Sequence, residues 1–345
     1  MRPILIELPS KALAALSLIA AAAFFIRELV NRLRKTGAPW SSTPVLLFAA
    51  AWALLGLRGG HWVPSRAALF EPWVSLPIFS YGVMLGSSLV VGWFVVMKFA
   101  KQDGVQSAPA GAIYMWSTVW SMVGARALYV VTNLSAFDGL VEALMLQKGG
   151  MVAYGGMIGG FLASWYGCHR RHIPLLQWAD IAAPAVVLGT GITRLGCFLY
   201  GCDYGRPSGV AWAVAFPNGS SAWDRHIRLR LITPDAAASL PVHPTQLYEA
   251  AVGFGLFALL LWIRRQRTFS GQVFLGWVLG YGLARPALEV LRDDDQRGSL
   301  GPLSTSQWIG LTSAAMGVVL AVALVRRHRQ DPKALRYWEN RPLPR

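Results

Sequence analysis

The chain has 345 residues, of which 54% are hydrophobic and only 14% charged, and its mean hydropathy is +0.42. An average soluble domain is about one-quarter charged, so this composition argues against a water-soluble globule and against intrinsic disorder. The formal net charge is +15, but the basic residues fall in short runs between apolar stretches, unlike those of a nucleic-acid-binding face, so we expect no nucleic-acid partner.

Nine apolar segments are long enough to approach the roughly 20 residues that cross a bilayer. They lie at about residues 11–29, 43–57, 76–97, 111–132, 151–167, 178–200, 245–263, 271–290 and 306–325. The first is followed at once by Arg27-Glu28 and not by a small-residue cleavage site, which favours a retained span over a signal peptide. The predicted fold is an all-α, polytopic membrane bundle of about nine transmembrane helices.

The basic residues of the loops predict the orientation of this bundle. If all nine segments cross, the main Lys and Arg runs fall on one side: residues 27–35, 98–101, 170–171, 264–267 and 326–345. The positive-inside rule then places the N-terminus outside and the C-terminus in the cytoplasm. We divide the chain into an N-terminal extension (1–75), a membrane core (76–327) with an outer loop (201–243), and a basic cytoplasmic tail (328–345) that touches anionic lipid.

Ionisable residues inside apolar segments cost about 2.5–3.5 kcal/mol each on insertion scales, so they are candidates for function. Six lie in or at the edge of a segment: Arg126, Asp180, Arg194, Glu249, Arg285 and Glu289. One interpretation is that they pair with one another, for instance Arg126 with Asp180, and only hold the bundle together. The other is a site, because the last four fall near the outer ends of their segments.

Arg285, Glu289 and Arg292 are spaced at i, i+4 and i+7, which places them on one helix face, and Pro286 should kink that helix. No acidic cluster is evident that would fully neutralise Arg194 and Arg285, so we expect a bound anion. Arginine forks match phosphate oxygens, and a phospholipid head group is the most abundant anion at that depth.

The glycine run 149–160 allows two interpretations. Its glycines suit close helix packing through small-xxx-small contacts. Alternatively, the two Gly-Gly pairs around Tyr154, of which Gly155-Gly156 is the second, expose backbone amides to an anion at the outer membrane edge. Further along, Pro244 suits the first position of a helix, which makes Gln246 and Glu249 face the same way.

Six motifs, in this order, resemble the prolipoprotein diacylglyceryl transferase family of bacterial membrane enzymes. They are Tyr81-Gly82; Gly124-Ala125-Arg126 with Tyr129; Gly149–Gly160; Arg194-Leu195-Gly196 with Gly205-Arg206-Pro207; His243–Glu249; and Tyr281-Gly282 with Arg285, Glu289 and Arg292. The resemblance covers about residues 76–327. Residues 1–75 are two extra segments that the seven-span family core lacks.

The resemblance implies an enzyme of lipoprotein biosynthesis in the bacterial inner membrane, with its active site toward the outer leaflet. Such enzymes move the diacylglyceryl group of phosphatidylglycerol to the lipobox cysteine thiol in the signal peptide of a prelipoprotein, and release glycerol phosphate. The expected partners are therefore phosphatidylglycerol, the lipobox segment and the surrounding membrane lipids. We expect neither a cofactor nor a metal.

Individual roles also follow from the resemblance. Arg194 occupies the position of the family's arginine for the lipid phosphate, and Arg285 that of a second essential arginine. Glu289 matches the helical neighbour of that second arginine, and Tyr81 matches a tyrosine of the substrate cavity. The residues expected to act in catalysis are Tyr154, Arg194, His243, Arg285 and Glu289. Those expected to bind substrate are Tyr81, Arg126, Gly155, Gly156, Arg194, Arg206, Gln246, Tyr248 and Glu249.

Three positions depart from the family pattern: Tyr154 stands where His is frequent, Cys197 where Asn is usual and Cys202 where Glu is usual. Tyr is a weaker base than His, so we expect the arginines to acidify the thiol, Tyr154 to hydrogen-bond the lipid, and His243 or Glu249 to take the proton. Cys197 and Cys202 could bind a metal with His243 or form a disulfide, but two buried thiols are the favoured interpretation.

Two other functions are compatible with these departures. A divergent paralogue would bind anionic phospholipid but alkylate another acceptor. A non-enzymatic protein would use the arginines only to hold head groups. A transporter fits less well, because the charged residues gather under one leaflet and not at the midplane.

Overall fold

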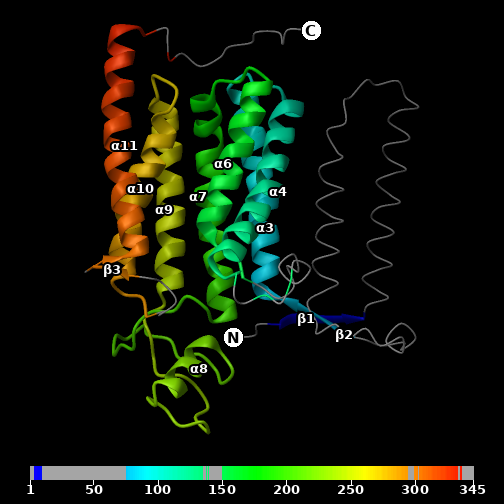
Figure 1. Cartoon of the computed structure of the whole chain (residues 1–345), viewed down its shortest axis with the longest axis vertical. Helices are drawn as coiled ribbons and strands as arrows, with labels where there is room; N and C mark the ends of the chain where they lie inside the picture. Colours follow the sequence, from blue (N-terminus) through cyan, green and yellow to red (C-terminus); the bar gives the residue numbers. More distant parts are fainter. Residues whose placement is uncertain are drawn as a thin grey trace. The chain divides into compact units, whose positions relative to one another are not determined.

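The computed structural model describes residues 4–9, 75–134, 137, 139, 150–293, 299–301, 303–332 and 335 (Figure 1). Within these residues eight helices dominate the architecture. The predicted apolar segments at 11–29 and 43–57 lie outside the described residues. Two short ribbons complete the secondary structure, one of β1 (Ile4–Pro9) with β2 (Ser75–Phe79) and one of β3 (Ser299–Leu300) with β4 (Leu303–Ser304).

Seven long helices coincide with the seven predicted segments that can be compared. They are α3 (Ser80–Gln102), α4 (Ser107–Thr132), α6 (Ala153–Arg170), α7 (Leu175–Tyr200), α9 (Thr245–Gln266), α10 (Gln272–Glu289) and α11 (Thr305–Gln330). Four of them, α3, α7, α9 and α11, are long and apolar enough to cross a membrane. The predicted helical class is therefore confirmed.

The chain divides into two compact units, and each is described by itself. The described residues of the first unit lie within the ranges 4–5, 79–95 and 179–335. Those of the second lie within 6–9, 75–78 and 96–178. Helices α3 and α7 contribute residues to both units.

Close packing of α4 against α6 organises the second unit, and glycines make it possible. A Cβ atom on Gly155 would lie 2.2 Å from the carbonyl oxygen of Gly124, and one on Gly159 would lie 2.2 Å from that of Trp120. Such distances leave room only for hydrogen, so the two backbones approach as in small-xxx-small helix pairs. The packing interpretation of the glycine run thus describes Gly155 and Gly159.

We expect Gly155→Ala to destabilise the protein by about 1–3 kcal/mol, because the added methyl group forces these two backbones apart. The matched control is Gly255→Ala in α9, where a Cβ atom would meet nothing within 4 Å. Thermal unfolding of both variants in the same detergent measures the difference. Equal unfolding temperatures for the two variants would contradict the packing role of Gly155.

In the first unit, α10 packs between α9 and α11 (Figure 1). A buried apolar cluster joins α9 and α10 to α7; it consists of Ala183, Val187, Leu260 and Val273. Helices α7 and α9 meet at a glycine pair, since a Cβ atom on Gly253 would lie 2.9 Å from the Cα of Gly191. The carboxylate of Asp180 fixes the start of α10, because it accepts hydrogen bonds from the backbone N–H groups of Gly271 and Phe274, both at 2.8 Å.

The segment from residue 201 to residue 244 forms a cap beyond the end of α7 and the start of α9, and contains α8 (Ser221–Arg228) (Figure 1). Its own small core consists of Tyr204, Phe216, Ala222 and Val242. Buried His226 accepts a hydrogen bond at Nδ1 from the Leu240 N–H at 3.1 Å. Burial lowers the pKa of His226, which keeps the imidazole neutral and able to accept this bond.

Candidate active site

Three arginines and three carboxylates of the first unit form one buried network, here named the arginine–carboxylate cluster. Its members are Arg194, Asp203, Glu249, Arg285, Glu289 and Arg292. They come from the last two turns of α7, the loop after it, the first turns of α9, the last turns of α10 and the residues just beyond α10. The cluster therefore lies where three helices end beside the cap.

Glu249 is the centre of the cluster. It pairs with the Nε of Arg194, lies 2.7 Å from the Nη1 of Arg292 and lies 3.6 Å from the Nη1 of Arg285. Its side chain is only 4% exposed. A carboxylate buried this deeply is stable in its charged form only because cations surround it.

The other two carboxylates bind at the periphery. Asp203 pairs with Arg194 at 3.1 Å through Oδ2 and with Arg292 through Oδ1. Glu289 pairs with Arg285 at 2.5 Å and accepts a hydrogen bond from the hydroxyl of Ser304 at 3.2 Å. Because Ser304 also caps α11, Glu289 connects the cluster to the start of that helix.

The structure corrects two sequence predictions here. We expected arginines without an acidic cluster to neutralise them, but three carboxylates accompany the three arginines. We also expected Arg285, Glu289 and Arg292 on one helix face, but α10 ends at Glu289. Arg292 reaches the cluster from the following loop, which an isolated β-bridge between Gly205 and Arg292 fastens to the cap.

The three arginines differ in their access to solvent or lipid. The Arg194 side chain is 19% exposed, that of Arg285 is 10% exposed and that of Arg292 is 2% exposed. A phosphate group that approaches the cluster therefore meets Arg194 first. Arg292 is placed to fix the two carboxylates that also hold Arg194.

Side chains at the start of α9 bind the backbone around Asp203 and so set its position. The hydroxyl of Thr245 donates to the Asp203 carbonyl at 2.8 Å, and the amide of Gln246 donates to the Cys202 carbonyl at 2.6 Å. The first turn of α9 thus holds the loop that follows α7. Gln246, predicted as a substrate-binding residue, has this positioning contact in the structure.

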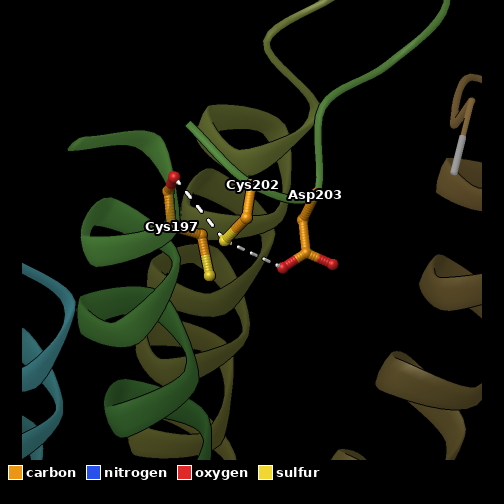
Figure 2. Close-up of side chains that lie close together, drawn as sticks. All are labelled: Cys197, Cys202 and Asp203. Atoms are coloured by element: carbon orange, nitrogen blue, oxygen red, sulfur yellow. Dashed lines mark hydrogen bonds between the residues drawn. The ribbon is translucent and has the colours of Figure 1, made fainter. Parts of the chain in front are cut away.

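Cys197 and Cys202 lie beside the cluster as free thiols (Figure 2). Their sulfur atoms and a carboxylate oxygen of Asp203 all lie within 4.8 Å of one another, a spacing that could hold a soft metal ion. The Cys202 thiol donates toward Asp203 at 3.5 Å. Its pKa is raised by the contact with the Cys197 thiol, by burial and by the Asp203 carboxylate, which keeps it protonated for this bond.

His243 and Tyr248 form a hydrogen-bonded chain with Trp212. The indole N–H of Trp212 donates to the Tyr248 hydroxyl at 2.6 Å, and that hydroxyl lies 3.3 Å from Nδ1 of His243. The backbone of His243 pairs with that of Gly205 and Arg206, both at 3.0 Å. His243 is therefore oriented by its neighbours at the junction of the cap and α9.

Two further predicted residues flank the same region. Arg206 is exposed, and its Nε donates to the carbonyl of Arg292 at 3.3 Å. Tyr81, in the first turn of α3, lies against the last turns of α7, since a Cβ atom on Gly196 would meet the Tyr81 Cα at 3.4 Å. Both belong to the first unit together with the cluster.

The remaining predicted residues belong to the second unit. Arg126 donates to the carbonyl of Gly150 at 3.0 Å, and its guanidinium lies over the ring of Tyr129 at 5.6 Å. Gly150 has a φ of +79°, so Arg126 stabilises a turn that suits glycine just before α6. Tyr154 lies in the first turn of α6, and Gly155 and Gly156 are buried beside it. Their contact with substrate stays a prediction.

Neither Asp203 nor Arg292 was among the residues predicted to act in catalysis or to bind substrate, and Asp203 was not singled out from the sequence at all. A signal for Asp203 was present: it is a lone acidic residue between two glycines, at 201 and 205, three positions after the apolar segment 178–200 that contains Arg194. Gly201 has a φ of +87°, which turns the chain back toward the end of α7. A carboxylate placed at such a turn can reach the arginine of the preceding helix.

Comparisons with known proteins place the sequence among curated relatives. The family model of prolipoprotein diacylglyceryl transferase matches residues 67–323. The chain is 31% identical to a phosphatidylglycerol–prolipoprotein diacylglyceryl transferase of Clostridium tetani over 253 residues, which is 73% of this chain and 95% of that protein. Proteins of the same name from Zymomonas mobilis and Geobacter sulfurreducens are 33% and 32% identical, covering 71% and 72% of this chain and 79% and 91% of their own lengths.

Proposed function

The chain belongs to the prolipoprotein diacylglyceryl transferase family, and we propose that it transfers the diacylglyceryl group of phosphatidylglycerol to the thiol of a prelipoprotein cysteine. The observation that carries this proposal is the arginine–carboxylate cluster, with Arg194 as its most exposed cation. Glycerol phosphate is the second product. The acceptor cysteine is that of a signal-peptide lipobox.

The reaction needs a cation at the phosphate and an acceptor for the thiol proton. The cysteine sulfur forms a bond to the terminal glycerol carbon of the diacylglyceryl group, and the bond from that carbon to the phosphate oxygen breaks. The oxygen leaves with the phosphate, where negative charge develops. Arg194, assisted by Arg285, stabilises this charge, because arginine forks match phosphate oxygens.

The geometry favours His243 over Glu249 as the proton acceptor. Three arginines contact Glu249 and occupy both of its carboxylate oxygens, so neither oxygen is free to approach the acceptor thiol. The Nδ1 of His243 is engaged by the Tyr248 hydroxyl, which orients Nε2 toward the acceptor thiol in this proposal. The thiol proton then leaves with the histidine and returns to the glycerol phosphate product.

We place the reaction in the bacterial inner membrane, at the outer leaflet. The seven helices, the two predicted segments before them and the basic runs support a nine-span topology with the N-terminus outside. Residues 76–327 are the proposed catalytic core, and the family match at 67–323 supports that boundary. Residues 1–75 are an extension, and residues 328–345 a basic tail at the cytoplasmic surface.

A direct assay tests the proposed function. The purified full-length chain is mixed with phosphatidylglycerol labelled in its acyl chains and with a peptide that carries a lipobox. Formation of a labelled thioether peptide is the expected result. Consumption of lipid without labelled peptide would indicate another acceptor, and binding of lipid without turnover would indicate a non-catalytic protein; either result overturns the proposal.

Tyr154→Phe tests whether Tyr154 takes part in proton transfer. We expect the variant to transfer within about threefold of the wild-type rate, because the phenol contributes one hydrogen bond to the lipid and no proton transfer. The rate is measured in the same thioether assay. A loss comparable to that of an Arg194 variant would make Tyr154 the base and would contradict the role given to His243.

A further inference from the structure

The thiols of Cys197 and Cys202 lie beside the arginine–carboxylate cluster, and the proposed reaction uses neither of them. The Arg194 guanidinium lies 3.9 Å from the Cys197 sulfur, and the Cys202 thiol lies 3.5 Å from the Asp203 carboxylate. Figure 2 shows both sulfur atoms and that carboxylate gathered at the end of α7. A chemical change at either sulfur therefore reaches two members of the cluster.

The backbone brings these cysteines together in advance. The N–H groups of Gly201 and Cys202 both donate to the Cys197 carbonyl, at 2.8 Å and 3.2 Å. The positive φ of Gly201, +87°, folds the chain back so that Cys202 lies over the last turn of α7. The sulfur atoms lie within 4.8 Å of each other, so side-chain rotation and a small shift of the loop are enough to reach the about 2.05 Å of a disulfide.

We propose that Cys197 and Cys202 form a reversible disulfide that lowers the activity of the adjacent arginine–carboxylate cluster. The inference rests on the proposed function and on the outward orientation proposed with it, because disulfides persist on the outer side of the bacterial inner membrane. The oxidant is another disulfide, of a protein or a small molecule. Cys202 is the more exposed thiol, so an external disulfide reaches it before it reaches Cys197.

The exchange proceeds in two balanced steps. The Cys202 thiol first loses its proton, a step that its raised pKa makes slow, and the thiolate then attacks one sulfur of the external disulfide, which forms a mixed disulfide and releases one thiolate. The Cys197 thiolate then attacks the Cys202 sulfur and releases the second thiolate. Two protons from the cysteines accompany the two leaving groups, so the external disulfide is reduced to two thiols and the cysteine pair is oxidised.

Oxidation changes the contacts of Arg194 and Asp203. The disulfide removes the Cys202 thiol proton, so Asp203 loses a hydrogen-bond donor and pairs more fully with Arg194. Cys197 also turns away from Arg194. A lipid phosphate must then compete with a stronger carboxylate for the most exposed arginine, which predicts slower transfer.

A metal ion at the same residues is the less favoured alternative. Cys197, Cys202 and Asp203 supply three ligand atoms of suitable kind. Arg194 and Arg292, however, already bind both oxygens of Asp203, and their positive charges oppose a cation there. The contacts therefore favour a disulfide.

Mass spectrometry tests whether the bond forms, independently of any activity. The full-length protein in phosphatidylglycerol nanodiscs is reduced, treated with oxidised glutathione, denatured with N-ethylmaleimide and digested. We expect Cys197 and Cys202 to escape alkylation and to appear as one linked peptide that lacks two hydrogens, while Cys168 is alkylated. Alkylation of all three cysteines, a glutathione adduct alone, or stoichiometric zinc that blocks oxidation would each overturn the proposal.

Activity and lipid binding test the consequence. We expect oxidation to slow thioether formation about fivefold, as loss of one ordinary hydrogen bond would do, and reductant to restore it. The same oxidation should reduce the rise in unfolding temperature that phosphatidylglycerol produces. Cys202→Ser should lose both responses, while Cys168→Ser, a buried cysteine of α6, should keep them and the basal rate.

These measurements separate the two proposals. A reduced protein without transferase activity counts against the proposed function. In that case the linked peptide still tests whether the disulfide forms, and the lipid-dependent unfolding temperature still tests whether it alters lipid binding. If complete oxidation changes neither the transfer rate nor the lipid response of the wild-type protein, the disulfide does not regulate the cluster and the inference is wrong.

Discussion

Replacing Arg194 with alanine is expected to lower the rate of thioether formation by about 10²–10³-fold, the usual effect of removing one group that stabilises developing charge. Arg194 is the most exposed of the three clustered arginines, so it is the one that a lipid phosphate can reach. Asp203 and Glu249 both keep Arg292 as a partner in this variant. The fold should therefore survive the substitution, and the loss should appear in the rate.

Initial rates with labelled phosphatidylglycerol measure this loss, and thermal unfolding confirms that the variant is folded. Arg194→Lys keeps the charge but not the bidentate fork, so it should fall between alanine and wild type. Arg265→Ala, an exposed arginine in the last turn of α9, is the matched control and should keep the wild-type rate. Equal rates for the Arg194 and Arg265 alanine variants would remove Arg194 from the reaction.

The positions of the helices followed from the sequence because each apolar run is nearly as long as a membrane is thick. Every predicted segment that can be compared coincides with a helix. The boundaries differ by a few residues, as for α7, which begins at Leu175 instead of 178. Polar residues such as Gln177 extend helices beyond the apolar run, and hydropathy alone does not register them.

The partners of the arginines could not be predicted in the same way. Arg194, Glu249 and Arg285 stand out because charge is costly inside an apolar segment. Asp203 lies in a loop, where charge costs nothing, and only the turn at Gly201 directs it back to Arg194. The spacing of Arg292 correctly predicted that it lies near Arg285 and Glu289, but not how it gets there. Helix α10 ends before Arg292, and pairing with the cap holds this residue in place.

For the glycine run 149–160, the sequence identified the residues but could not decide between two roles for them. Its sequence allowed both helix packing and exposed amides, and the choice depends on how closely α4 approaches α6. The close contacts of Gly155 and Gly159 with the backbone of α4 support the helix-packing interpretation. Gly150 is a third case, because its positive φ and its hydrogen bond from Arg126 make it a turn residue.

Glu249→Gln is expected to harm both folding and transfer. Glu249 contacts all three arginines of the cluster, so removing its charge leaves three cations, two of them buried, with two carboxylates. Breaking a buried ion pair costs about 3–5 kcal/mol. The freed arginines repel one another and move, and misplacement by about 1 Å can lower a rate about 10²-fold.

An anion should partly repair this variant, because the phosphate of phosphatidylglycerol can replace the missing charge. We therefore expect phosphatidylglycerol to raise the unfolding temperature of Glu249→Gln more than that of the wild type, while a zwitterionic lipid should not. Asp224→Asn, an exposed carboxylate in the first turn of α8, is the matched control and should behave as wild type. A Glu249→Gln protein with wild-type stability and rate would mean that the arginines hold their positions without this carboxylate, and that the cluster is not what prepares Arg194 for the phosphate.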